Sequence, residues 1–121
     1  MDNIKLLKQI SKIQKSLLKD GIVVDKLTKE LKTLRELFIE EKMPRIVKII
    51  RLTYEHIEQY KTFGILIPEE EDVEMEELNE DDAKIESLSY LLSLLQKPTQ
   101  KHNADDLNYY MQSFTEYSNA N

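Results

Sequence analysis

The residues with the clearest chemical pattern are five lysines near the start of the chain. They recur every three or four positions, which places them along one side of a helix. The set is Lys5, Lys8, Lys12, Lys15 and Lys19. The apolar residues of the same segment form a second stripe, roughly 150° from the lysines at 100° per residue. These are Leu6, Ile10, Ile13 and Leu17. The cationic side is a candidate contact for a polyanion such as RNA, DNA or an anionic membrane.

A solvated or internally neutralised surface is the more ordinary interpretation of these lysines. Nucleic-acid recognition usually combines lysines with Arg and aromatic residues. Neither of these residue types is interleaved with the five lysines. An internal partner also exists, because residues 69–82 hold ten carboxylates in fourteen positions. A nucleic-acid-associated regulator that uses the lysines, with the acidic segment as an intramolecular brake, is therefore the alternative function. A membrane contact is less favoured, because the apolar stripe is needed for helix packing.

Other residue types that carry chemistry form no motif. His56 and His102 belong to no zinc-binding pattern, and we interpret both as surface or helix-flanking residues. No Gly follows Gly64, which argues against a calcium loop in the acidic segment. The chain has no Cys, no glycine-rich phosphate loop and no nucleophile motif. We therefore expect a non-enzymatic protein with no catalytic residue, metal, cofactor or small-molecule substrate.

The composition is that of a helical protein. One third of the residues are charged, and there are only two Gly and three Pro. Residues 1–62 carry 14 Lys and Arg against 9 Asp and Glu, whereas residues 63–121 carry 3 against 14. No apolar run approaches the roughly 20 residues that span a bilayer, and the lysine-rich start does not resemble a signal peptide. We expect a cytoplasmic protein.

The apolar periodicity predicts three long helices in the first half. Asp2 or Asn3 can cap the first helix, which Asp20 and Gly21 end. Asp25 is the expected N-cap of the second helix. Pro44 either kinks this helix or opens a third one, and we prefer the new helix. We expect the third helix to end at Phe63 and Gly64.

The second half is predicted to cover the first. Residues 65–82 are expected to form an apolar strap and an acidic linker, and 83–117 two shorter covering helices. Asn79 and Asn103 are the expected caps of these two helices, and Lys97-Pro98 the end of the first. Residues 118–121 should fray. The whole chain, 1–121, is expected to be one helical domain with a three-helix core over 1–64.

These patterns predict an all-α fold. We expect a four- or five-helix up-down bundle, built on an N-terminal helical hairpin plus a third long helix, with an acidic connecting segment. Four apolar residues lie off their helical stripes, and we interpret them as a protein interface. They are Leu37, Ile39, Leu52 and Leu94. The expected function is protein–protein interaction, as an adaptor, assembly factor or regulator, with a homodimer as the expected state.

Overall fold

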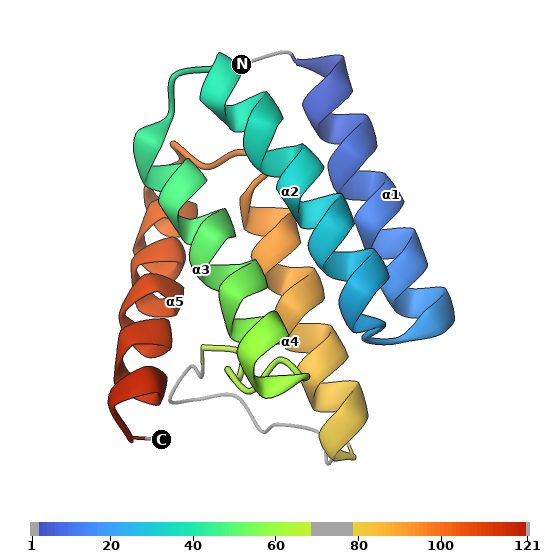
Figure 1. Cartoon of the computed structure of the whole chain (residues 1–121). Coiled ribbons are helices and arrows are strands. Elements are labelled where there is room, and N and C mark those ends of the chain that lie inside the picture. Colours follow the sequence, from blue (N-terminus) through green and yellow to red (C-terminus); the bar gives the residue numbers. More distant parts are fainter. Residues whose placement is uncertain (1–2, 69–78, 121) are drawn as a thin grey trace.

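The computed structural model describes residues 3–68 and 79–120, and within these ranges it is an all-helical bundle of five helices (Figure 1). The predicted fold class is confirmed. The helices are α1 (Ile4–Asp20), α2 (Val24–Glu40), α3 (Pro44–Tyr60), α4 (Glu80–Leu94) and α5 (Lys101–Ala120). No helix in the described ranges is long and apolar enough to cross a membrane.

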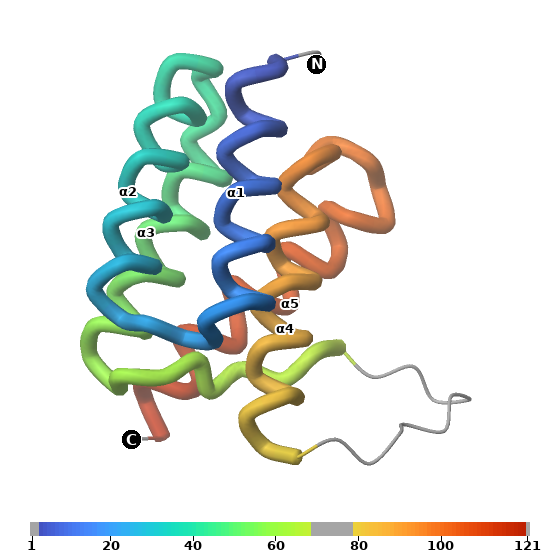
Figure 2. The backbone as a smooth tube through the Cα atoms, turned by 90° about the vertical axis from the view of Figure 1, so that its right-hand side faces the viewer, coloured from blue at the N-terminus to red at the C-terminus, as the bar shows by residue number. Residues whose placement is uncertain are grey.

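Consecutive helices run antiparallel, so the chain passes up and down the bundle five times (Figures 1 and 2). Around the bundle, however, the helices do not follow chain order. α2 packs between α1 and α3, α4 packs against α1, and α5 packs against both α3 and α4. The α4–α5 hairpin therefore closes a ring of five helices around one apolar core.

The start of the chain folds as its cap signals predict. The Asn3 side chain accepts a hydrogen bond from the backbone N–H of Leu6 (3.2 Å), and Gly21 ends α1 at a φ of 72°. Pro44 is the first residue of α3, where its missing N–H costs no helical hydrogen bond. The prediction for Asp25 was wrong: α2 begins at Val24 with Val23 as its N-cap, two residues earlier than predicted. Asp25 therefore lies in the first turn, where a carboxylate suits the helix dipole.

α3 ends at Tyr60, three residues before the predicted end at Phe63. Lys61 takes a left-handed conformation, with φ 59°, and stops the helix. In a continued helix Phe63 would lie seven residues after the buried His56, about 20° from it around the helix axis. The chain leaves the helix at Lys61, and Phe63 and Ile65 are both buried in the core.

The caps of the second half are predicted correctly at one helix only. The Asn79 side chain accepts a hydrogen bond from the backbone N–H of Asp82 (2.8 Å) at the start of α4. α5 begins at Lys101, and Asn103 lies inside it, where its side-chain amide donates to the carbonyl of Lys97 (3.0 Å). α5 has 20 residues and is longer than α1–α4, so it is not the short cover that was expected. Nothing after Lys101 breaks a helix, since the segment has neither Gly nor Pro.

A buried tyrosine ties α4 to α5. Tyr110 is inaccessible to solvent, and its hydroxyl donates to the backbone carbonyl of Ser87 (2.9 Å) and lies 3.0 Å from the Ser87 hydroxyl. Burial raises the pKa of Tyr110 above its ordinary value, because the interior disfavours a phenolate. The neutral phenol is therefore a fixed polar link within an apolar core.

Candidate functional site

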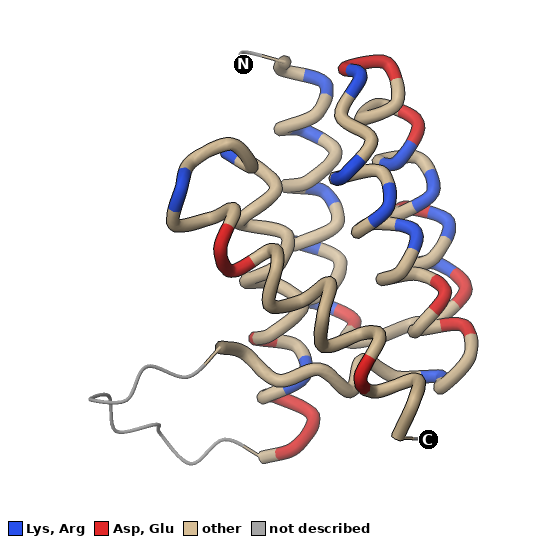
Figure 3. Tube along the Cα trace, turned by 90° about the vertical axis from the view of Figure 1, so that its left-hand side faces the viewer, with Lys and Arg blue, Asp and Glu red and all other residues tan. Residues whose placement is uncertain are grey.

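The lysines of α1 lie on the outer surface of the bundle, as their spacing predicts. All five are exposed, and within the described ranges none of them forms an ion pair. Four of them line a surface hollow of about 480 Å³ between α1 and the start of α2. The other lining residues are Ser11, Ser16, Asp20 and Lys26. Figure 3 shows Lys and Arg concentrated along α1, α2 and α3.

A buried carboxylate lines a small neighbouring hollow, which shares Ser16, Asp20 and Lys26 with this one. Glu30 of α2 is only 8 % exposed, and one of its oxygens is 3.5 Å from the Ser16 hydroxyl. Its other oxygen, Oε1, has no hydrogen-bond partner among the described residues. Asp20 adds a second carboxylate there and pairs with Lys26 at 3.2 Å. The positive charge that these carboxylates do not offset therefore lies on the N-terminal part of α1, from Lys5 to Lys15.

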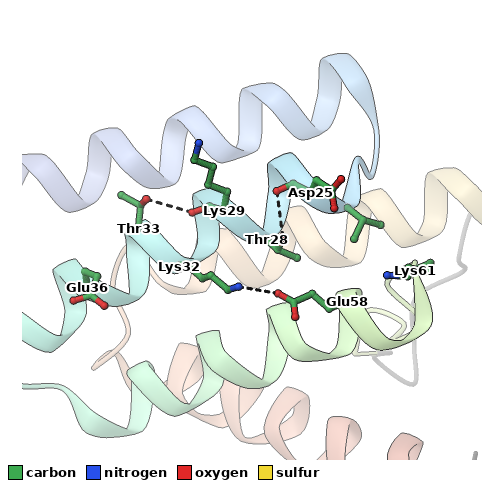
Figure 4. Close-up of a pocket in the computed structure, with 9 residues that line it drawn as sticks. Asp25, Thr28, Lys29, Lys32, Thr33, Glu36, Glu58 and Lys61 are labelled. Atoms are coloured by element: carbon green, nitrogen blue, oxygen red, sulfur yellow. Dashed lines mark hydrogen bonds and ion pairs between the residues drawn. The ribbon is translucent and has the colours of Figure 1, made fainter.

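A larger hollow of about 800 Å³ lies between α2 and α3 (Figure 4). Three lysines and three carboxylates line it: Lys29, Lys32, Lys61, Asp25, Glu36 and Glu58. Lys32 bridges to Glu58 across the two helices at 3.1 Å and lies 5.2 Å from the centre of the Tyr54 ring. The charges are balanced, and most of the lining residues are exposed. The hollow thus lacks the buried, unbalanced charged side chains that are typical of a catalytic pocket.

The four residues predicted as an interface do not come together. Leu94 is buried in the core of the same chain, so it has no free surface to offer a partner. Leu37 and Leu52 are half-buried and pack against the core from different helices. Ile39 alone of the four is exposed, with 43 % of its surface free. Their positions off the stripes are explained mainly by the wide buried arcs of a five-helix ring.

Another apolar surface lies near the end of the bundle where α1 begins. Two neighbouring hollows of about 360 and 450 Å³ share three lining residues, Met43, Pro98 and Thr99. The first is completed by Pro44, Arg45, Ile46, Ala104 and Leu107. The second is completed by Leu7, Gln96, Lys97 and Gln100. We call the two hollows together the end groove.

The end groove is built from three separate parts of the chain. The α2–α3 turn supplies Met43, the α4–α5 turn supplies Pro98 and Thr99, and α1 supplies Leu7. Its charged lining residues are Arg45 and Lys97, and no carboxylate lines either hollow in the described part of the chain. The groove is therefore apolar with positive margins.

The interpretation of His56 as a surface residue was wrong. It is buried, and its Nε2 accepts a hydrogen bond from the backbone N–H of Gly64 (2.9 Å). Four aromatic rings surround it at centroid distances of 4.8–5.7 Å: Tyr60, Phe63, Phe114 and Tyr117. Burial lowers the pKa of His56 to about 4. The neutral ring is a hydrogen-bond acceptor that holds the backbone at Gly64 close to α3 and α5.

The backbone beside His56 packs closely against α5. A side chain on Gly64 would come within 2.7 Å of the Tyr117 ring, so the backbone packs directly on α5. Among the residues described, no three His, Asp or Glu side chains lie close enough together to hold a metal ion. His102, the other histidine, is exposed on α5 beside Asp106.

Comparison of the chain with models of known protein families, with curated proteins and with solved structures gave no match. The end groove was missed by sequence reasoning. Pro44 was correctly placed at the start of a helix, whereas α4 ends at Leu94, before its predicted end at Lys97-Pro98. Nothing in the sequence says that the α2–α3 and α4–α5 turns lie side by side.

Proposed function

We propose that this chain is a non-enzymatic protein-interaction module, acting as an adaptor, assembly factor or regulator, and that the end groove is its binding site. The observation that supports the proposal is the groove itself. It is a formed apolar depression of the kind that accepts a few anchoring side chains. Leu7 at its margin is 43 % exposed, so apolar surface is left for a partner to cover.

The charges around the groove specify the chemistry of the partner. Arg45 and Lys97 line it without a carboxylate beside them, so an acidic segment is attracted and a basic one is repelled. Two adjoining hollows suit two apolar side chains on one face of a short helix. The proposed ligand is therefore an acidic, amphipathic peptide segment of another protein.

A binding assay tests this proposal. The probe is a fluorescein-labelled amphipathic peptide of about 14 residues, four helical turns, with Leu on one face and Glu on the others. The control probe has the same composition with the Leu residues dispersed around the helix. Fluorescence anisotropy is measured against the intact chain. We expect the amphipathic probe to bind and to weaken as salt rises, and the control probe to bind at least tenfold more weakly.

Two leucines of α1 give a matched pair of variants. Leu7→Glu places a carboxylate in the groove, whereas Leu18→Glu makes the same change at a 71 % exposed leucine outside it. We expect Leu7→Glu to lose tenfold or more in affinity, which corresponds to about 1.4 kcal/mol. Leu18→Glu should bind like the unchanged chain. Equal losses in both variants, or no binding of the amphipathic probe to the unchanged chain, would reject the groove as the site.

A further inference from the structure

We infer that the outer face of α1 is a second binding surface, independent of the end groove, that contacts the phosphate backbone of nucleic acid without reading its sequence. The surface consists of Lys5, Lys8, Lys12, Lys15 and Lys19, with the hydroxyls of Ser11 and Ser16 beside them. Between Ile4 and Lys19 the helix carries no carboxylate. Five positive charges therefore lie along one line, and the carboxylate of the same helix, Asp20 at its last position, pairs with Lys26.

The helix is held so that these lysines remain available. The side chain of Gln9 donates to the carbonyl of Glu30 in α2 (3.1 Å), and that of Gln14 donates to the carbonyl of Ser89 in α4 (3.2 Å). These bonds join α1 to both of its neighbours and fix its rotation about its axis. Successive lysines rise about 4.5 or 6 Å along the helix, so the array from Lys5 to Lys19 is about 21 Å long. Its length covers several phosphates of one strand, which are about 3.4 Å apart along a duplex axis.

The residues between the lysines favour nucleic acid over an acidic protein. The hollow on this face is lined by Lys, Ser and Asp alone. Protein interfaces have an apolar centre, whereas phosphate oxygens are contacted chiefly by lysine, arginine and hydroxyl side chains. No aromatic ring or arginine lies on the face to stack on a base or to read one. A backbone contact without sequence preference is the chemistry that remains.

Salt dependence gives this inference a quantitative test. Anisotropy of a labelled DNA duplex of about 20 base pairs is measured with the intact chain at several salt concentrations. Four to five phosphate contacts predict a slope of log K against log salt of about −3.6 to −4.5, or a loss of roughly 150- to 500-fold between 50 and 200 mM. Two duplexes of unrelated sequence should bind within twofold of each other. An RNA duplex of the same length shows which nucleic acid is preferred, and binding of either supports the inference.

Two double charge reversals of equal net charge test whether binding depends on this face of α1 or only on the net charge of the protein. Lys12→Glu with Lys15→Glu should weaken binding at least tenfold at 50 mM salt and reduce the slope by about two. Lys29→Glu with Lys48→Glu changes the net charge equally on α2 and α3 and should bind within threefold of the unchanged chain. Equal losses in both double variants, or no binding at 50 mM salt, overturn the inference. So does equal displacement of the duplex by polyglutamate of the same charge, which would assign the face to an acidic protein.

The end groove is tested separately from this surface. Leu7→Glu should leave duplex binding within threefold, and the double change at Lys12 and Lys15 should leave binding of the amphipathic peptide within threefold. Failure of one proposal therefore leaves the other in place.

Discussion

His56 is a titratable residue that the bundle keeps neutral. Its ring lies among four aromatic side chains, and its Nε2 accepts the N–H of Gly64. A proton on Nε2 would remove this acceptor and place a charge in the core. This is the physical reason that burial lowers the pKa of His56 from 6.5 to about 4.

The lowered pKa of His56 predicts how stability depends on pH. Between pH 6.5 and 4 the unfolded chain binds a proton at this residue and the folded chain does not, so stability falls as the pH falls. The loss from this group is up to about 3 kcal/mol, fully expressed below pH 4. Urea unfolding of the unchanged chain and of His56→Gln, measured from pH 7 to pH 4, tests this. The variant should lose less stability over that range.

His102 supplies the control for this prediction. It is the other histidine, it is exposed on α5, and its ring does not contact the core. His102→Gln should keep the pH dependence of the unchanged chain. If His56→Gln retained that dependence as well, the carboxylates and not His56 would account for the acid sensitivity.

At the scale of the element, the end of α3 contains a strained residue. Lys61 has φ 59° and ψ 21°, a left-handed conformation that suits glycine better than a residue with a side chain. Its N–H still donates to the carbonyl of Ile57 (2.9 Å), so the helix end is formed in spite of this cost.

This strain predicts that Lys61→Gly stabilises the protein. The expected gain is about 0.5–1 kcal/mol, because the relief of strain exceeds the added entropy of the unfolded chain. Thermal and urea unfolding both measure it. Gln59→Gly, two residues earlier and inside the helix, should instead lose about 1 kcal/mol. A Lys61→Gly variant as unstable as Gln59→Gly would contradict this account of the helix end.

The α1 helix shows how one element can serve two purposes. Its inner side supplies Leu6, Ile10, Ile13 and Leu17 to the core, and all four are buried. Its outer side carries the lysines, and its flanks carry the glutamines that bond to α2 and α4. The acidic segment considered as a brake for this surface falls largely on residues 69–78, which lie outside the described residues.

At the scale of the whole molecule, self-association stays a prediction. Of the four residues that suggested it, Leu94 is in the core, and Ile39 has an exposed side chain. If a homodimer forms through the exposed side chain of Ile39, Ile39→Glu should shift the measured mass toward that of a monomer. Leu66→Glu, which changes another exposed residue at the other end of the bundle, is the control. Light scattering at micromolar concentration measures the mass. A monomer of the unchanged chain would end the prediction.

The uneven charge along the chain is visible on the helices. Residues 1–62 form the three helices that carry most of the Lys and Arg, and α4 opens with Glu80, Asp81 and Asp82 in its first turn (Figure 3). The ion pairs of the described residues each lie within one half of the chain, so the apolar core holds the two halves together. The end groove forms where the two halves meet.

The sequence by itself determined the local structure of this protein. Apolar residues at helical spacing identified the buried side of α1, because a helix must bury its apolar side wherever it packs. Asn3, Gly21, Pro44 and Asn79 placed helix ends correctly, because caps act within one turn of the backbone. The position of the lysine array follows from the same periodicity.

Only the tertiary structure decided which distant residues meet. The periodicity of α3 does not show that α5 lies beside it, so the rings around His56 and its burial were not predictable. Likewise Met43 and Pro98 form one groove because the ring of helices places two turns together. Helix α3 ends at Tyr60, and Phe63, which follows it, is buried in the core. Helical spacing specifies which side of a helix is apolar, whereas the choice of its neighbours depends on packing over the whole chain.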